Sequence, residues 1–233
     1  MSLIRKSLSR GLLATLLLMA AAGAGAATPA RVLALGDSYT IGEGVPEAER
    51  WPVQLAARLA QDGVACAAPT IVARTGWTTD ELLAAIEQTN LAPPYDLVTL
   101  LIGVNNQYRG YPPEQYRREF DALLERALGL AGGNAAHVVV LSIPDWGVTP
   151  FARSAGRDAA RIARDLDGYD AIARELARAR GVAYIDVTAT TRARGAEPDM
   201  LTSDGLHPSG RMYALWTEAV LPVVLPRLRD GVR

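Results

Sequence analysis

Three residues far apart in the chain carry the side chains of a nucleophile, a base and an acid. Ser38 ends the motif Gly36-Asp37-Ser38, directly after an apolar run, and His207 follows Asp204 by three positions. In a tight turn this spacing lets the Asp204 carboxylate accept a hydrogen bond from Nδ1 of His207, which leaves Nε2 free as a base. We therefore expect acyl-transfer chemistry, with Ser38 as nucleophile, His207 as base and Asp204 as the partner of the base.

Two further loops carry groups that can donate hydrogen bonds to a developing oxyanion. Gly76 lies in Arg74-Thr75-Gly76-Trp77, where the missing Cβ lets a backbone N–H approach a ligand closely. Asn105 follows the most apolar of the predicted strands, and its side-chain NH₂ is a suitable additional donor. Each residue alone is more typical of an ordinary turn or helix cap. Together with Ser38 and His207 they make four such residues on four separate predicted loops, which favours a common site.

Several other chemistries lack the residues that they need. The chain has two histidines, and His137 directly precedes an apolar run, so it is expected to face away from the site. The single cysteine, Cys66, adds no second ligand, and a metal site needs three or four. The single lysine, Lys6, lies near the N-terminus, which excludes lysine-dependent chemistry in the rest of the chain. We predict no metal and no cofactor.

The first 27 residues are typical of a secretory signal peptide. Three basic residues within 5–10 precede an apolar stretch at 11–22, and small residues at 24–27 offer cleavage sites. The apolar stretch is shorter than the roughly 20 residues that a membrane-spanning helix needs. We expect an exported protein, periplasmic or secreted, with a single domain at 28–233 and no stable membrane anchor.

The charge of the mature segment bears on its partners. Loss of three basic residues from the 24 in the chain leaves 21 against 25 acidic residues, a net charge of −4. This argues against a nucleic-acid partner and, more weakly, against an anionic membrane surface. The expected partner is the ester substrate itself, a small molecule, a lipid or a carbohydrate.

The elements that position these residues alternate between strands and helices. Five apolar runs rich in β-branched residues predict strands at 32–35, 70–73, 97–102, 138–142 and 182–187. Apolar residues recur at helical spacing between them, and a last helix is expected from about Pro208 towards Val224. This alternation predicts a parallel sheet between two helical layers, a three-layer α/β/α domain. Ligands bind beyond the carboxyl ends of such strands, where the candidate residues lie.

The four motifs together resemble those of the SGNH, or GDSL-type, serine hydrolases. The order and spacing of Gly36-Asp37-Ser38, Gly76, Gly103-Val104-Asn105 and the segment 204–208 agree with the family, over nearly the whole mature chain. The resemblance implies a flavodoxin-like sheet of order 2-1-3-4-5 and hydrolysis of a carboxylic ester through an acyl-enzyme. It also implies an oxyanion hole formed by the Ser38 and Gly76 N–H groups and the Asn105 side chain.

Two residues depart from the family pattern, and the substrate class stays open. Tyr39 stands where the family has its leucine, and Asn106 where an aspartate commonly follows the asparagine. Esterase, lysophospholipase, thioesterase-like and carbohydrate acetylesterase activities all fit. Aromatic residues in or beside the loops are candidates for binding the substrate, namely Tyr39, Trp77, Tyr108 and Trp146.

Two other functions use the same scaffold. A flavodoxin-like domain holds a flavin phosphate after its first strand, but Asp37 would repel the phosphate with no lysine to offset it. A non-catalytic carbohydrate- or lipid-binding module is the second alternative, and the presence of every catalytic group counts against it. A flavin absorption spectrum and a fluorophosphonate probe discriminate these functions from a serine hydrolase.

Overall fold

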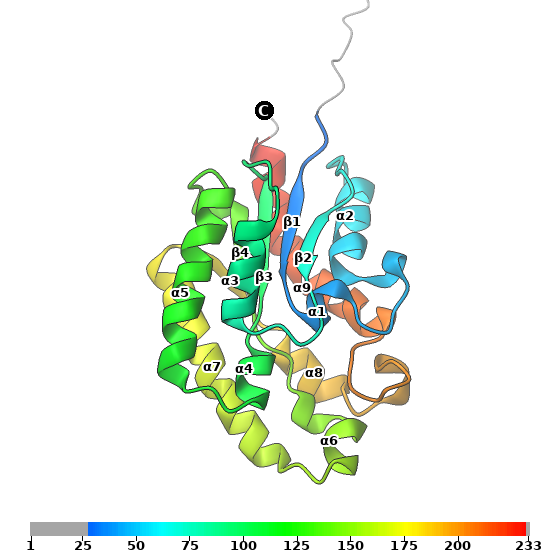
Figure 1. The fold of residues 1–233 in the computed structure, drawn as a ribbon. Helices are drawn as coiled ribbons and strands as arrows, with labels where there is room; N and C mark the ends of the chain where they lie inside the picture. Colours follow the sequence, from blue (N-terminus) through cyan, green and yellow to red (C-terminus); the bar gives the residue numbers. More distant parts are fainter. Residues whose placement is uncertain (1–27, 232–233) are drawn as a thin grey trace, which may run out of the picture.

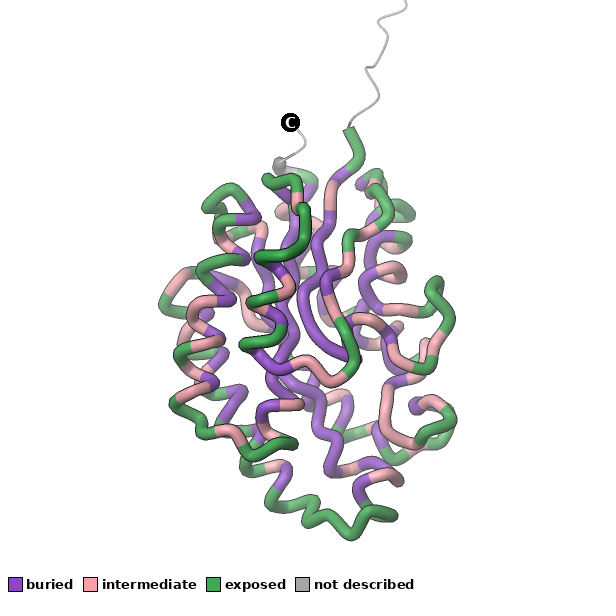
Figure 2. The backbone as a smooth tube through the Cα atoms, viewed as in Figure 1, coloured by how far each residue is buried: buried purple, intermediate pink, exposed green. Residues whose placement is uncertain are grey.

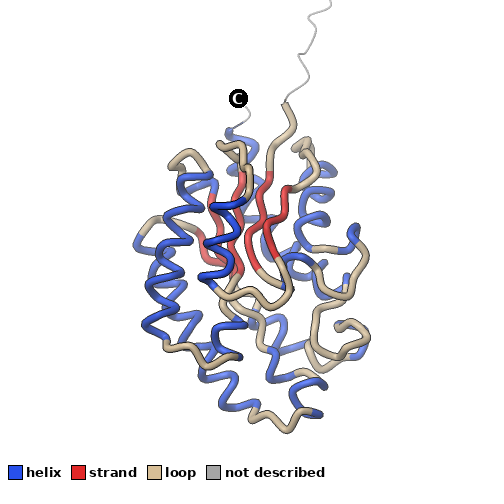
Figure 3. The backbone as a smooth tube through the Cα atoms, in the orientation of Figure 1, coloured by secondary structure: helices blue, strands red, loops and turns tan. Residues whose placement is uncertain are grey.

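The computed structural model describes residues 28–231. The predicted signal peptide, 1–27, lies outside the described residues. Within them, five parallel strands form one sheet in the order β2-β1-β3-β4-β5. The strands are β1 (Val32–Gly36), β2 (Thr70–Ala73), β3 (Leu97–Leu101), β4 (Val138–Leu141) and β5 (Ala183–Ile185). Helices cover both faces of the sheet, as Figures 1 and 3 show. The three-layer α/β/α prediction and the order 2-1-3-4-5 are confirmed.

The register of the sheet places the ends of its central strands at one level. Gly36, the last residue of β1, pairs with Ala73 of β2 on one side and with Leu101 of β3 on the other. The loops that carry Ser38, Gly76 and Asn105 therefore leave the sheet side by side. Every residue of β1, β3 and β4 is buried, which explains why these runs are apolar without alternation (Figure 2).

Long amphipathic helices form the two outer layers (Figure 1). On one face α2 (Trp51–Gln61) packs against α9 (Gly210–Gly231), and the other face carries α3 (Thr79–Gln88), α5 (Pro113–Leu130) and α7 (Ala159–Ala179). The last helix continues past Val224, the predicted end, although it contains two prolines. Buried apolar residues continue at a spacing of four beyond the first proline, and we attribute the extension to their burial, which outweighs the lost hydrogen bonds.

The carboxyl edge of the sheet is built from short helices where the sequence indicated loops. These are α1 (Ser38–Ile41), α4 (Val104–Tyr108), α6 (Pro150–Ser154) and α8 (Thr188–Arg194). Short 3-10 turns complete the described chain at Glu47–Glu49, Ala135–His137, Trp146–Val148 and Pro198–Met200. The fifth strand is shorter than predicted, because the N–H of Val187 donates to Oγ of Ser142, at 2.8 Å, instead of to a neighbouring strand. None of the helices within 28–231 is long and apolar enough to cross a membrane.

Candidate active site

Ser38 is the first residue of α1, where β1 turns sharply into the helix. The turn needs a glycine before it, because a Cβ on Gly36 would lie 2.5 Å from the carbonyl oxygen of Leu101. Asp37 caps the helix, and its Oδ1 accepts a hydrogen bond from the N–H of Tyr39 at 3.0 Å. Within residues 28–231 the Ser38 N–H meets no protein acceptor, and neither does Ser38 Oγ. Both groups are thus available to a ligand, although Ser38 is largely buried.

Asp37 lies beside the candidate nucleophile but has a different environment from Asp204. It is fully buried, and burial raises its pKa to about 7, although the hydrogen bond from the Tyr39 N–H acts in the opposite direction. The structure places no histidine in hydrogen-bond contact with it among the described residues. Asp37 therefore fixes the turn and does not orient a base.

His207 and Asp204 share a tight turn just before α9. Oδ2 of Asp204 lies 2.6 Å from Nδ1 of His207, the contact that their spacing predicts. The other carboxylate oxygen accepts the N–H groups of Leu206 and His207, at 2.8 and 3.0 Å, and the hydroxyl of Thr202, at 2.7 Å. Partial burial raises the pKa of Asp204, but these hydrogen bonds outweigh it and lower the pKa to about 2. The carboxylate is ionised at neutral pH.

Gly76 and Asn105 meet across the gap between the β2 and β3 loops. The side-chain amide of Asn105 donates one hydrogen bond to the carbonyl oxygen of Trp77, at 2.9 Å. Its second N–H meets no acceptor among residues 28–231. Gly76 has a φ of +88°, a conformation that favours glycine. In the part of the chain that the structure describes, its N–H donates to no protein atom.

The candidate residues line one cavity of about 250 Å³. Ser38, Gly76, Asn105 and His207 reach it from four different segments of the carboxyl edge, and Asp204 contacts His207. Three of the predicted substrate-binding residues also line it, namely Tyr39, Tyr108 and Trp146. Trp77 is placed elsewhere, because its ring packs partly buried against the core. The sequence did not indicate four other lining residues, which are Thr75, Val104, Phe151 and Leu206.

Aromatic rings form one wall of the cavity. The Trp146 indole lies edge-on to Tyr108, with ring centroids 5.4 Å apart, and its Nε1–H donates to Oε1 of Gln107 at 2.9 Å. The buried carboxylate of Asp145 holds the segment in place through the N–H of Gly147, at 2.9 Å, and through Nε of Arg192, at 2.8 Å. The wall is therefore anchored by hydrogen bonds as well as by packing.

Tyr39, the departure from the family's leucine, belongs to the core as much as to the cavity. It is almost fully buried, and its ring packs against His207 and against Trp216, with centroids 5.9 and 6.1 Å apart. The contact with His207 places an apolar surface behind the imidazole.

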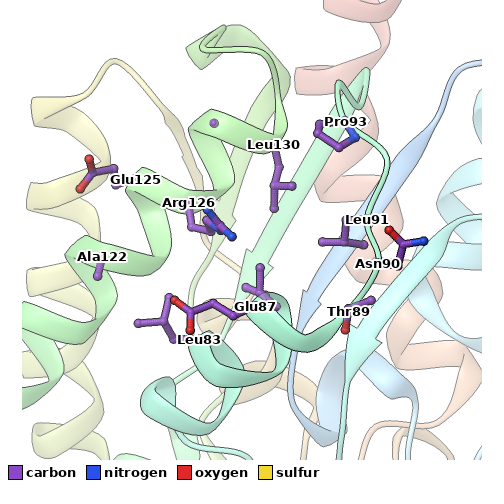
Figure 4. A pocket seen from close by; sticks show the side chains of 12 residues that line it. Leu83, Glu87, Thr89, Asn90, Leu91, Pro93, Ala122, Glu125, Arg126 and Leu130 are labelled. Atoms are coloured by element: carbon purple, nitrogen blue, oxygen red, sulfur yellow. The ribbon is translucent and has the colours of Figure 1, made fainter.

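A larger cavity lies at the opposite edge of the sheet. It measures about 740 Å³ and lies between the C-terminal ends of α3 and α5, where Figure 4 shows Glu87, Arg126 and Leu91 around it. It contains none of the candidate residues. In addition, no three His, Cys, Asp or Glu side chains of residues 28–231 lie together as a metal site. The groups with chemistry therefore gather at the carboxyl edge, as expected for this class of fold.

Comparisons with known proteins agree with this arrangement. The model of the GDSL-like lipase/acylhydrolase family matches residues 34–215. The comparison with curated proteins gave no match.

Several solved structures share the fold. The lipase/acylhydrolase from Enterococcus faecalis has a TM-score of 0.66 at 20% identity, over 85% of this chain and 96% of that chain. A variant of Axe2, an acetyl xylan esterase from Geobacillus stearothermophilus, has a TM-score of 0.64 at 19% identity, over 84% and 94%. The esterase EstA from Pseudoalteromonas sp. has a TM-score of 0.63 at 16% identity, over 85% and 98%. Since the family model covers most of the sequence, the chain belongs to the GDSL-like lipase/acylhydrolase family.

Proposed function

We propose that this protein is an exported serine hydrolase that cleaves carboxylic esters through an acyl-enzyme on Ser38. The observation that carries the proposal is the convergence of Ser38, His207, Gly76 and Asn105 on one cavity, each from a different segment of the carboxyl edge. Family membership supports ester hydrolysis and disfavours the flavin-binding alternative. The reaction class therefore rests on the family, and the roles of the individual residues rest on the geometry.

The proposed reaction begins with attack of Ser38 Oγ on the ester carbonyl while Nε2 of His207 takes the hydroxyl proton. The alcohol leaves with that proton, and water then releases the acid from Ser38 by the reverse route. Asp204 supports the tautomer with a proton on Nδ1 and stabilises the imidazolium, since its low pKa keeps it ionised. Catalytic hydrogen bonds are often long in unliganded structures, so the absence of one at Ser38 Oγ is compatible with this role.

Three donors would hold the oxyanion that forms during attack. They are the backbone N–H groups of Ser38 and Gly76 and the second N–H of the Asn105 side-chain amide. The two backbone N–H groups meet no protein acceptor within 28–231. Donors that are fixed before the reaction and aimed at the developing charge usually supply the largest catalytic contribution.

The cavity favours a small acyl ester. Its volume of about 250 Å³ lies below the roughly 300–1,000 Å³ typical of sites for drug-sized ligands, and the wall of Tyr108, Trp146 and Phe151 is apolar. The similar structure named above as an acetyl xylan esterase gives an acetylated sugar as one reasonable substrate. We therefore propose short acyl groups, on an alcohol that extends out of the cavity.

Steady-state kinetics test this proposal. The substrates are nitrophenyl esters of increasing chain length and an acetylated polysaccharide. We expect the purified protein to hydrolyse nitrophenyl acetate and butyrate in preference to longer esters. Ser38→Ala should lose at least about 10³-fold in kcat, whereas Thr89→Ala, which removes an exposed hydroxyl at the other edge of the sheet, should not change it. Retention of activity by Ser38→Ala contradicts the proposed nucleophile.

Export is tested on the chain that includes residues 1–27. Expressed in a Gram-negative host, it should appear outside the cytoplasm with an intact mass that corresponds to cleavage near residues 24–27. An unprocessed cytoplasmic product contradicts export and leaves the proposed chemistry untouched.

A further inference from the structure

The helix α4 holds the loop that carries Gly76. Asn105 and Arg109 lie one helical turn apart, at α4 and its C-terminal cap, and both donate to carbonyl oxygens of the facing loop. Nδ2 of Asn105 binds the oxygen of Trp77 at 2.9 Å, and an Nη of Arg109 binds the oxygen of Gly76 at 2.7 Å. Two adjacent peptide groups are therefore anchored by side chains of the same short helix.

A third contact from α4 fixes the far end of this loop. Asn106 is fully buried, its Oδ1 accepts the N–H of Thr79 at 3.1 Å, and its Nδ2 donates to the Thr79 hydroxyl at 2.6 Å. An aspartate at this position could accept the N–H but, when ionised, has no proton to donate. The far end is thus locked inside the protein. At the Gly76 end, the Trp77 N–H donates to the carbonyl oxygen of Arg74 at 3.2 Å, and Arg109 supplies the side-chain contact to the Gly76 carbonyl oxygen.

Gly76 is the point of the loop with the greatest conformational freedom. Its φ is +88°, and because glycine has no Cβ it populates positive and negative φ with similar ease. Gly76 lines the candidate cavity, and its C=O is the group that Arg109 binds. Fixing the carbonyl limits rotation about the Gly76 backbone and so limits where the N–H points.

The guanidinium is itself held by a second element. Another Nη of Arg109 lies 3.4 Å from a carboxylate oxygen of Glu81, which belongs to the capping box of α3. Arg109 thereby connects α4, the Gly76 loop and α3. Its side chain is 41% exposed, so this ion pair adds little to the stability of the fold.

We propose that Arg109 is a positioning residue, which holds the Gly76 N–H in line with the oxyanion of the transition state. The inference rests on the proposed function. Arg109 acts through Gly76 and not by contact with the reacting atoms. Small displacements of a donor reduce transition-state stabilisation steeply, whereas an exposed ion pair affects folding weakly. Loss of Arg109 should therefore reduce turnover far more than stability or ground-state binding.

The test compares Arg109→Ala and Arg109→Lys with the wild type on a short nitrophenyl ester. Arg118→Ala is the matched control, because Arg118 is also exposed and donates to a carbonyl oxygen, that of Glu114, on α5. We expect Arg109→Ala to lower kcat by about 10- to 100-fold with KM within about 3-fold. An arylboronic acid, whose boron adds to Ser38 Oγ to form a tetrahedral anion, should lose affinity by a similar factor.

Rescue by lysine separates positioning from mere packing. The ammonium group that Arg109→Lys introduces can donate to the Gly76 carbonyl, so this variant should recover much of kcat and of boronate affinity. A kcat of Arg109→Ala within about 2-fold of wild type overturns the proposal, and so does a rise in KM at constant kcat. If the wild type shows no hydrolysis that Ser38→Ala abolishes, the proposed function fails instead.

Discussion

The Asp204 carboxylate binds both the ring and the backbone of His207. Its Oδ2 lies 2.6 Å from Nδ1 of the imidazole, and its Oδ1 lies 3.0 Å from the backbone nitrogen of the same residue. One carboxylate thus holds both the ring and the main chain of His207. Thr202 and Leu206 in turn donate hydrogen bonds to this carboxylate. A turn of four residues, 204–207, is enough to build an oriented base.

Replacement of Asp204 by asparagine tests this orientation. Asp204→Asn keeps the size of the side chain but removes the charge and permits the wrong imidazole tautomer, so kcat should fall by about 10²- to 10⁴-fold. KM should change little, because the cavity does not include Asp204. The measurement is the steady-state kinetics of a nitrophenyl ester. A loss below about 10-fold would mean that Asp204 does not support the base.

Asn105 is expected to act on the transition state alone. Asn105→Ala removes one donor of the proposed oxyanion hole and should lower kcat by about 10²- to 10³-fold at nearly constant KM. The hydrogen bond to Trp77 is lost as well, so circular dichroism and the thermal midpoint should be recorded on the same sample. A folded variant with a drop of only a few-fold would remove Asn105 from the oxyanion hole.

Asp37 gives a prediction for the pH dependence of stability. Its pKa is about 7 in the folded protein and near 3.8 when unfolded, so the folded state binds the extra proton between these values. The contribution of Asp37 to the free energy of unfolding is therefore fully present below about pH 4 and is lost as the pH rises to about 7. Relative to the wild type, Asp37→Asn should gain stability over this window by up to roughly 4 kcal/mol, at about 1.4 kcal/mol per pKa unit.

Urea unfolding of both proteins between about pH 4 and 8 measures this difference. Asparagine retains an acceptor for the Tyr39 N–H and cannot ionise, so the slope of the difference against pH isolates Asp37 from other acids. Parallel curves over the whole range would show that the carboxyl is ionised throughout.

Trp146 is expected to limit the length of the group that the cavity accepts. Trp146→Ala opens the aromatic wall, so kcat/KM for hexanoate relative to acetate should rise about 10-fold or more. Trp77→Ala is the control, since Trp77 packs against the core outside the cavity, and it should leave the ratio unchanged. Hydrolysis of a series of nitrophenyl esters gives the ratio. An unchanged ratio in Trp146→Ala would exclude this wall from substrate selection.

The sequence predicts the sheet well because three of its strands, β1, β3 and β4, are completely buried. Continuous apolar runs such as 97–101 are distinctive, and the outer helices repeat their apolar residues over several turns. The short helices α1 and α4 carry no such signal, because a helix of four or five residues is too short to show a period. Their existence depends on caps and on contacts with other loops.

The site could be predicted in its chemistry but not in its full lining. Ser38, His207 and Asn105 were found because few residue types can do what they do. Phe151 and Leu206 have no chemical signature, and they line the cavity because of how distant loops pack. A position in an active-edge loop does not determine where a ring points, as the Trp77 indole shows by packing against the core. Contacts such as that of the Arg109 side chain with the β2 loop, 33 residues away, are ones that no local pattern indicates.

Covalent labelling of Ser38 tests the central claim most directly. Ser38, the proposed nucleophile, is expected to react with phosphonate reagents, which form a covalent bond with activated serines. A fluorophosphonate should add once to the wild type, with the mass increase on the peptide that contains Ser38 and loss of esterase activity in proportion. Ser38→Ala should not be labelled, and His207→Ala should react much more slowly. An unlabelled wild type, or equal labelling of Ser38→Ala, would contradict the acyl-enzyme mechanism and favour a non-catalytic binding module.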